Sequence, residues 1–319
     1  MTAAIPVTLI GGYLGAGKTT LVNSLLRNAA GRRLAVLVNE FGALPIDADL
    51  IEARDDNLIS ISGGCICCSF GSDLVGALID IRGRGQPIDH LLIETSGVAL
   101  PGSIVQSLAL VQGLAIDGVI VLADAETIEE RARDRYMGDT VLAQLAVADI
   151  IVLNKIDLVS EPSTAATLGW LARIVPGARV LPARNASLPP EVILGRDPRH
   201  HTGHMELHDH ETTGFATLSL KIDGPRDADR LAGVLADPRL GLLRAKGFVR
   251  RLDGVLVTLH VVGRRALVEA APSWVRGPGR LVCVGLAAEM DRAAILAAVE
   301  DQGSPIRRSP PDERGDGRE

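Results

Sequence analysis

The chain has 319 residues, of which 47% are hydrophobic and 23% are charged, and its formal net charge is −6. This composition is typical of a soluble globular protein, and the length allows two domains that each bury a core. The negative charge argues against a general nucleic-acid-binding surface, which needs a basic face. No apolar run reaches the roughly 18 residues that cross a bilayer, and the first residues have no signal-peptide pattern. We therefore expect a cytoplasmic protein that binds neither nucleic acid nor membrane.

Residues 1–184 alternate short apolar runs with helical patterns, which predicts an α/β domain with a mainly parallel sheet covered by helices on both faces. The expected strands are 6–10, 34–38, 57–61, 89–93, 118–122, 149–153 and 178–181. The expected helices are 18–28, 71–82, 104–110, 140–146 and 162–174.

A glycine-rich segment at residues 12–20 follows the first expected strand and begins the first expected helix. It contains Gly-x-x-x-x-Gly-Lys-Thr, which is a P-loop in the context that this motif requires. The backbone N–H groups of such a loop surround phosphates, helped by the positive end of the helix dipole. We therefore predict a P-loop NTPase in which Lys18 is catalytic and contacts the β- and γ-phosphates, while Thr19 ligates Mg²⁺. The other nucleotide contacts are expected from Gly12, Gly15, Ala16, Gly17 and Thr20.

Two acidic residues follow expected strands at the edge where a parallel sheet binds its ligand. Glu94 closes the fourth strand, so its carboxylate should point into the ligand crevice, with a catalytic role near Mg²⁺. The N–H of Gly97 is then expected to contact the γ-phosphate, although Glu94 could instead cap a helix. Glu40 follows the second strand and could orient the attacking water, contact Mg²⁺ or bind a metal beside the cysteines. Its alternative is an ordinary loop carboxylate.

The segment Asn154-Lys155-Ile156-Asp157 follows the sixth expected strand. An aspartate in this position can accept hydrogen bonds from the ring N–H and the exocyclic amine of guanine. Adenine would leave that carboxylate unpaired, at a considerable cost in binding free energy. We therefore predict that Asn154, Lys155 and Asp157 select GTP rather than ATP. The alternative is a strand-ending turn capped by Asp157.

Three of the four cysteines, Cys65, Cys67 and Cys68, follow a pair of glycines that permits the bend needed to bring their thiols together. Clustered cysteines in a reducing compartment are more often metal ligands or redox centres than disulfides. Three thiolates suit Zn²⁺, Cu(I) or another thiophilic ion and leave a fourth position, which either takes another ligand or stays open. A redox dithiol and buried inert thiols are the alternatives. Cys283, in an apolar run, is expected in the core.

The second half of the chain changes character. Residues 185–213 are polar and rich in proline and histidine, which predicts a linker that binds divalent ions weakly or is merely solvated. Its histidines are His200, His201, His204, His208 and His210. Residues 214–302 predict a smaller α+β domain, and residues 303–319 a disordered tail. Its expected strands are 215–222, 242–251, 255–262 and 280–285, and its helices are 227–235 and 291–301.

With these motifs in this order, the chain resembles the CobW-type family of metal-handling P-loop GTPases, which also includes HypB- and UreG-like proteins. The resemblance extends over nearly the whole length and rests on residues 11–20, 39–42, 64–68, 94–97 and 154–157. It implies a GTPase domain, a C-terminal CobW-type domain and a GTP-dependent metallochaperone that delivers an ion to a client metalloenzyme. Many relatives carry an acid directly after the Asn-Glu-Phe-Gly segment, where this chain has Ala43. If relatives use this acid as a ligand of an accessory metal site, this chain lacks that ligand.

We therefore predict a slow GTPase that binds Zn²⁺, with Co²⁺ as the next choice, through its three clustered thiolates. Hydrolysis would loosen the site for release, and by linkage the metal must change GTP affinity or turnover. Slow turnover is expected because no arginine finger is evident. Two alternatives remain, a metal- or redox-sensing GTP switch and a dedicated activator of one enzyme such as a nitrile hydratase or cobaltochelatase. A metal-dependent homodimer also remains open.

Overall fold

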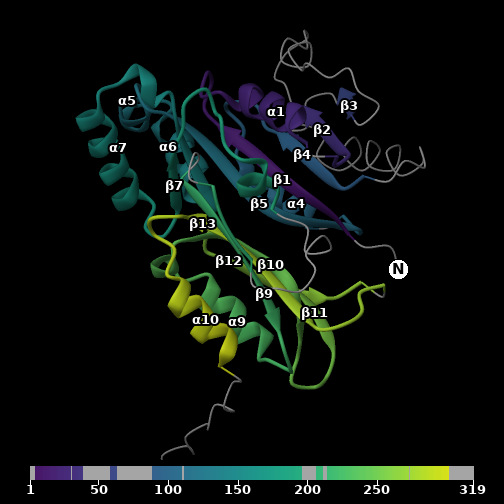
Figure 1. Cartoon of the computed structure of the whole chain (residues 1–319). Coiled ribbons are helices and arrows are strands. Elements are labelled where there is room, and N and C mark those ends of the chain that lie inside the picture. The colour runs from purple at the N-terminus through teal and green to yellow at the C-terminus, as the bar shows by residue number, and fades with distance from the viewer. Residues whose placement is uncertain are drawn as a thin grey trace, which may run out of the picture.

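The structure is a computed structural model that describes residues 4–29, 31–38, 58–62, 88–109, 111–195, 206–210, 214–272 and 274–301. These residues form two lobes, each built around one β-sheet (Figure 1). Every strand pair of the first sheet is parallel, and every strand pair of the second sheet is antiparallel. In the described part of the chain, no helix has the length and apolar character needed to span a membrane.

The first sheet has seven strands in the order β3-β2-β4-β1-β5-β6-β7. Its strands are β1 (Ile5–Gly12), β2 (Leu34–Val38), β3 (Leu58–Ser62), β4 (His90–Glu94), β5 (Leu114–Asp124), β6 (Ile150–Asn154) and β7 (Arg179–Pro182). All seven predicted strands are confirmed, although β5 begins earlier than predicted. Their nearly continuous apolar runs fit strands that are covered on both faces, as in most parallel sheets.

Helices cover both faces of this sheet. One face carries α4 (Pro101–Leu108), α5 (Ile128–Arg133), α6 (Gly138–Ala146) and α7 (Glu161–Ile174). The opposite face carries α1 (Lys18–Arg27) and the short α8 (Pro190–Leu194). A single 3₁₀ turn, η1 (Ile156–Leu158), follows β6. The sequence predicted α1, α4, α6 and α7 but neither α5 nor α8, and the helix expected at 71–82 lies outside the described residues.

The second sheet has six strands in the order β12-β11-β10-β13-β9-β8. Its strands are β8 (Glu206–His210), β9 (Phe215–Ile222), β10 (Leu242–Arg250), β11 (Leu256–Val262), β12 (Arg265–Ala270) and β13 (Gly279–Leu286). Helices α9 (Ala228–Leu235) and α10 (Arg292–Glu300) pack on one face, and a 3₁₀ turn, η3 (Pro238–Leu240), precedes β10. This α+β lobe confirms the predicted class. The sequence missed β8 and β12.

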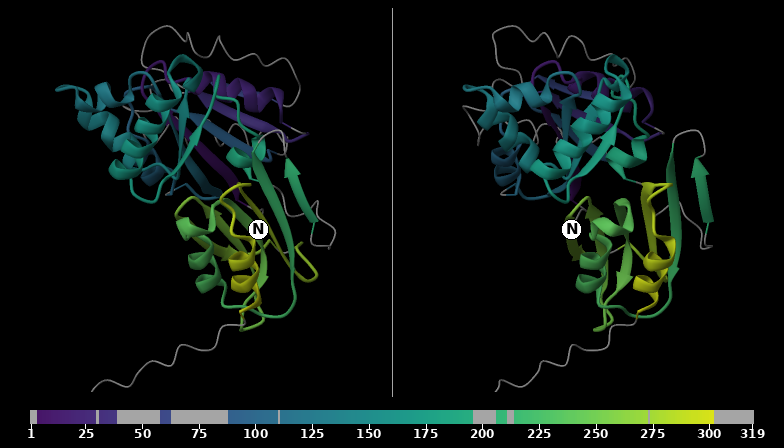
Figure 2. Two further views of the ribbon diagram at one scale, coloured as in Figure 1. Left: turned by 60° about the vertical axis from the view of Figure 1, so that its left-hand side comes forward. Right: turned by 90° about the vertical axis from the view of Figure 1, so that its left-hand side faces the viewer.

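The two lobes lie one above the other (Figure 2). They share a hydrophobic core. Val192 and Ile193 of α8 are fully buried in it, together with Leu243, Val262 and Val284 of the second sheet. The segment that the sequence predicted to be a polar linker therefore begins with a buried helix between the sheets.

Candidate nucleotide-binding site

The P-loop connects β1 to α1 at the carboxyl edge of the first sheet. Gly12, Gly15 and Gly17 all have positive φ angles. Gly17 is the N-cap of α1 with φ 101°, and a Cβ at this position would collide with the side-chain amide of Asn154. Because L residues avoid this region of φ, only glycine meets both requirements. The backbone N–H groups of the loop therefore lie at the start of α1, where an anion binds favourably.

The structure brings together the residues predicted to bind phosphate and Mg²⁺. The ammonium of Lys18, the first residue of α1, donates a hydrogen bond to the Tyr13 carbonyl at 3.3 Å. Beside it, the Thr19 hydroxyl donates to Oε1 of Glu94 at 2.8 Å, although the two residues are 75 positions apart. Glu94 is only 2% exposed at the end of β4. A hydroxyl and a carboxylate are hard oxygen donors, so this pair fits Mg²⁺.

The loop after Glu94 lies directly against the P-loop. A Cβ on Gly97 would be 2.7 Å from the backbone nitrogen of Leu14, so this close approach requires glycine. The loop is held from behind by α6, because the buried Gln144 amide donates to the carbonyls of Gly97 at 3.0 Å and Ala99 at 2.8 Å. The sequence predicted a role for Gly97 but none for Gln144, since a glutamine inside a helical pattern carries no signal of its own.

The side chain of Asn154 connects two loops of the site. Its side-chain amide donates to the Ala16 carbonyl of the P-loop at 2.9 Å. Its side-chain oxygen accepts a hydrogen bond of 2.7 Å from the backbone N–H of Ala186. Asn154 therefore ties the P-loop to the loop at residues 183–187, which follows β7.

The next residues of the segment predicted to select guanine turn outward. Lys155 has a left-handed backbone (φ 63°), and its ammonium forms an ion pair with Asp124 at 2.7 Å. Asp157, in η1, is exposed and accessible to a base. Asn185 and Ala186 also have positive φ angles, 49° and 50°. Such strain in residues other than glycine is concentrated at functional sites. Neither Asp124 nor the loop at 183–187 was predicted from the sequence.

Several predicted metal-binding residues lie outside the described residues, namely Glu40, Cys65, Cys67, Cys68, His200, His201 and His204. His208 and His210 belong to β8, which pairs antiparallel with β9. Within the described residues, no group of three or more His, Cys, Asp or Glu side chains could hold a metal ion. Cys283 is buried as predicted, and this burial raises the pKa of its thiol to about 12.

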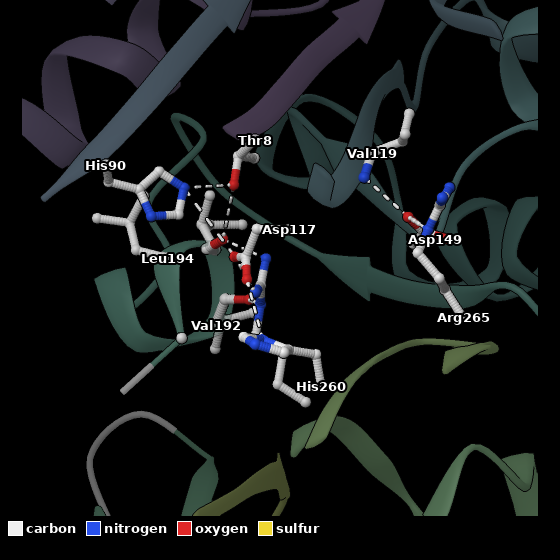
Figure 3. Close-up of polar contacts among 12 residues, drawn as sticks. Thr8, His90, Asp117, Val119, Asp149, Val192, Leu194, His260 and Arg265 are labelled. Atoms are coloured by element: carbon white, nitrogen blue, oxygen red, sulfur yellow. Dashed lines mark hydrogen bonds and ion pairs between the residues drawn. The ribbon is translucent and has the colours of Figure 1, made fainter. Parts of the chain in front are cut away.

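A second polar cluster lies between the two sheets (Figure 3). Burial lowers the pKa of His90 to about 3, and burial together with Lys246 lowers the pKa of His260 to about 3. Burial opposes ionisation of Asp117, but the Arg244 guanidinium, together with Lys246, His90 and His260, outweighs it and holds the pKa of Asp117 well below its usual range. At neutral pH the cluster therefore holds two neutral imidazoles beside a charged aspartate–arginine pair.

The fold and the P-loop geometry define a nucleotide-binding α/β domain joined to an antiparallel α+β domain. The family model of the CobW/HypB/UreG nucleotide-binding domain matches residues 6–182, and that of the cobalamin synthesis protein CobW C-terminal domain matches residues 215–302. The chain therefore belongs to the CobW/HypB/UreG family.

Similar proteins cover nearly the whole chain. The zinc chaperone CobW of a Sinorhizobium species is 30% identical over 92% of this chain and 96% of its own length. The zinc chaperone CobW of Pseudomonas aeruginosa is 31% identical over 92% of this chain and 90% of its own length. Among solved structures, that of the Zn(II)-bound YjiA GTPase from Escherichia coli is 24% identical, covers 95% of this chain and 100% of its own, and has a TM-score of 0.45.

Proposed function

We propose that this protein is a GTP-hydrolysing metallochaperone that binds Zn²⁺, with Co²⁺ as a second choice, and delivers it to a client metalloprotein. The observation that carries the nucleotide part is the contact of Thr19 with Glu94 beside Lys18. Similarity to two zinc chaperones supports the metal part.

In the proposed reaction, water attacks the γ-phosphorus of GTP, and the bond to the β-phosphate oxygen breaks to give GDP and phosphate. Lys18 would neutralise charge that develops on the β- and γ-phosphates. Thr19 and Glu94 would hold Mg²⁺, which supplies further neutralisation of phosphate charge when bound. Gly97, held against the P-loop by Gln144, would contact the γ-phosphate. Turnover is expected to be slow until a partner stimulates it, because the sequence shows no arginine finger.

Guanine selection would come from Asp157. Its carboxylate is exposed beside η1, where it can accept from the guanine ring N–H and exocyclic amine. Asn154 would support this pocket by joining the P-loop to the loop at 183–187.

The metal would be the cargo rather than a permanent part of the protein. Cys65, Cys67 and Cys68 supply three thiolates in this proposal, which leaves a fourth position open for exchange with a client. The cysteines lie in the chain between β3 and β4, the strand that ends at Glu94. Closure of that connection around GTP and Mg²⁺ would retain the ion, and hydrolysis would release it. Linkage then requires that Zn²⁺ and GTP change each other's affinity by the same factor.

The test is a measurement of Zn²⁺ affinity with GTP, with GDP and without nucleotide, together with GTP turnover across a Zn²⁺, Co²⁺ and Ni²⁺ series. The wild type is compared with a Cys65→Ser, Cys67→Ser, Cys68→Ser triple variant. A matched control changes His200, His201 and His204 to Gln and so removes three ligands from the histidine tract alone.

We expect the triple variant to lose tight Zn²⁺ binding and its dependence on nucleotide, while the histidine control retains both. Unchanged Zn²⁺ affinity and unchanged linkage in the triple variant would refute the metal site. A GTP affinity that responded to thiol oxidation but not to Zn²⁺ would favour a redox switch instead.

A further inference from the structure

The carboxyl end of α8 is held by two arginines, one from each lobe. Arg244 of β10 donates from Nε to the Val192 carbonyl at 2.6 Å and from a terminal nitrogen to the Ile193 carbonyl. Arg32, just before β2, donates to the carbonyls of Leu194 at 3.3 Å and Gly195 at 2.5 Å. The last carbonyls of a helix have no partner within that helix. The two arginines therefore satisfy four consecutive carbonyls and fix where α8 ends.

Arg244 is itself held in place by the first sheet. It is 3% exposed, and its other terminal nitrogen lies 2.5 Å from Oδ2 of Asp117. Asp117 is an extra residue in β5, because Val7 of β1 pairs with Ile116 while the next residue pairs with Gly118. Such a bulge redirects a side chain, and here it lets Asp117 meet an arginine of the second sheet. Removal of one partner would leave a buried charge unpaired, so this contact defines the position of Arg244.

Two histidines and a threonine surround this ion pair (Figure 3). His90 Nε2 lies 4.0 Å from Asp117 and 2.8 Å from the Thr8 hydroxyl, and Thr8 donates to the Ile193 carbonyl at 3.5 Å. His260 Nδ1 of β11 lies 3.9 Å from the other Asp117 oxygen. The polar groups of β1, β4 and β5 on this face thus converge with Arg244 on the end of α8.

The amino end of α8 is connected to the nucleotide site by a short loop. The loop at 183–187 precedes α8, and its Ala183 N–H donates to the Leu153 carbonyl of β6 at 2.8 Å. Ala186, from the same loop, donates to the side chain of Asn154, which in turn holds the P-loop. Ala186 and Val192 are both fully buried in the core that the two lobes share. A displacement of α8 would therefore move this loop.

We propose that Arg244 and Arg32 are positioning residues for the nucleotide site, and that the C-terminal lobe controls guanine-nucleotide affinity through Arg244. By fixing the end of α8 they hold the loop at 183–187, and with it Asn154, in the arrangement that binds the nucleotide. The inference rests on the proposed function, because it requires a guanine nucleotide between the P-loop and Asp157. Coupling of this kind is reciprocal, so bound GDP must also stabilise α8 against the C-terminal lobe.

The first test variant is Arg32→Ala, which removes two hydrogen bonds to α8 without leaving Asp117 unpaired. The second is Asp117→Asn combined with Arg244→Met, which removes both buried charges together and so avoids an uncompensated one. The matched control is Arg265→Ala. This arginine lies in the same interface between the lobes, but its guanidinium pairs with Asp149 at 2.9 Å.

The measurements are GDP affinity by fluorescence titration, the kcat and KM of GTP hydrolysis, and hydrogen exchange of residues 186–194 with and without GDP. We expect both α8 variants to bind GDP about tenfold more weakly, with a raised KM and a nearly unchanged kcat, as for lost ground-state binding. GDP should slow exchange in this segment of the wild type more than in either variant. Arg265→Ala should bind GDP within about twofold of the wild type.

Equal GDP affinity in the wild type and both α8 variants would overturn the inference. An equal loss in Arg265→Ala would also overturn it, because general loosening of the interface would then be sufficient. A wild-type protein that bound no guanine nucleotide would instead refute the proposed function itself.

Discussion

The carboxyl edge of the first sheet and the interface between the two sheets are both rich in polar side chains, but the two regions use them in opposite ways. At the edge, polar groups lie in segments that follow strands, and Asp157 and Thr20 are exposed, although Glu94 is buried. At the interface, Asp117, His90 and Arg244 lie on strands and are buried. The edge therefore has groups available for a ligand, whereas the interface satisfies its charges internally.

This difference predicts opposite effects of mutation. A substitution at the edge should reduce nucleotide binding or turnover and leave the free energy of unfolding nearly unchanged. A change at the interface should alter the free energy of unfolding directly, because a buried charge or imidazole has no access to water when its surroundings change. The following three predictions are ordered from the largest expected effect to the smallest.

The largest effect is expected for Lys18→Ala. Loss of the ammonium removes the positive charge that faces the β- and γ-phosphates, so GTP turnover should fall by about 100- to 1000-fold. The free energy of unfolding without nucleotide should change by less than about 1 kcal/mol, because a partly desolvated cation is removed with its hydrogen bond. Turnover assays and urea unfolding measure the two quantities.

Lys221→Ala is the matched control for this change, because Lys221 lies on β9 and pairs with Asp223 at the surface. It should leave both turnover and stability unchanged. Retention of turnover by Lys18→Ala would contradict the assignment of the P-loop as the phosphate site.

Acid should lower the free energy of unfolding through the buried histidines of the interface between the two sheets. The pKa of His90 is 6.5 in the unfolded chain and about 3 in the folded protein. Between these values the unfolded state binds more protons, so the free energy of unfolding should fall as pH decreases from about 6.5 toward 3. Burial dominates this shift, and Lys246, Arg244 and Arg32 add to it, whereas Asp117 opposes it. His260 should act in the same direction.

Asp149 should partly offset this loss, because burial raises the pKa of its carboxyl and the folded state then gains a proton first. Urea unfolding at a series of pH values should give a shallower acid slope for His90→Gln than for the wild type. An identical slope in the wild type, His90→Gln and His260→Gln would show that the buried histidines do not control acid stability.

The smallest effect is expected for Gln144→Leu, which tests how the loop around Gly97 is held at the nucleotide edge. The change removes the two hydrogen bonds that hold the loop around Gly97, so kcat should fall by about three- to tenfold. GDP affinity should stay the same, since GDP has no γ-phosphate. Gln106→Leu, at an exposed position of α4, is the control and should change neither quantity. An equal loss of GDP affinity and kcat in Gln144→Leu would contradict a role confined to the γ-phosphate side.

The sequence predicted the strands of the parallel sheet well because buried strands are continuous apolar runs that end at polar residues. It missed α5 and α8 because helices of six and five residues are too short to show a helical period. The residues on either side of α8 in the sequence are a second reason why it was not predicted. The prolines and polar residues around it are typical of a linker, and only the packing of Val192 and Ile193 between two sheets makes this segment part of a core.

By itself, the sequence determined the family and the P-loop and predicted the guanine motif, because each of these depends on local spacing along a strand, a loop and a helix. The tertiary structure alone decided which distant groups meet. Thr19 reaches Glu94 because β1 and β4 are neighbours in the sheet. Asp117 reaches Arg244, 127 residues away, because a bulge turns it toward the second sheet. Strand order and bulges arise from packing of the whole chain, so no local pattern encodes these contacts.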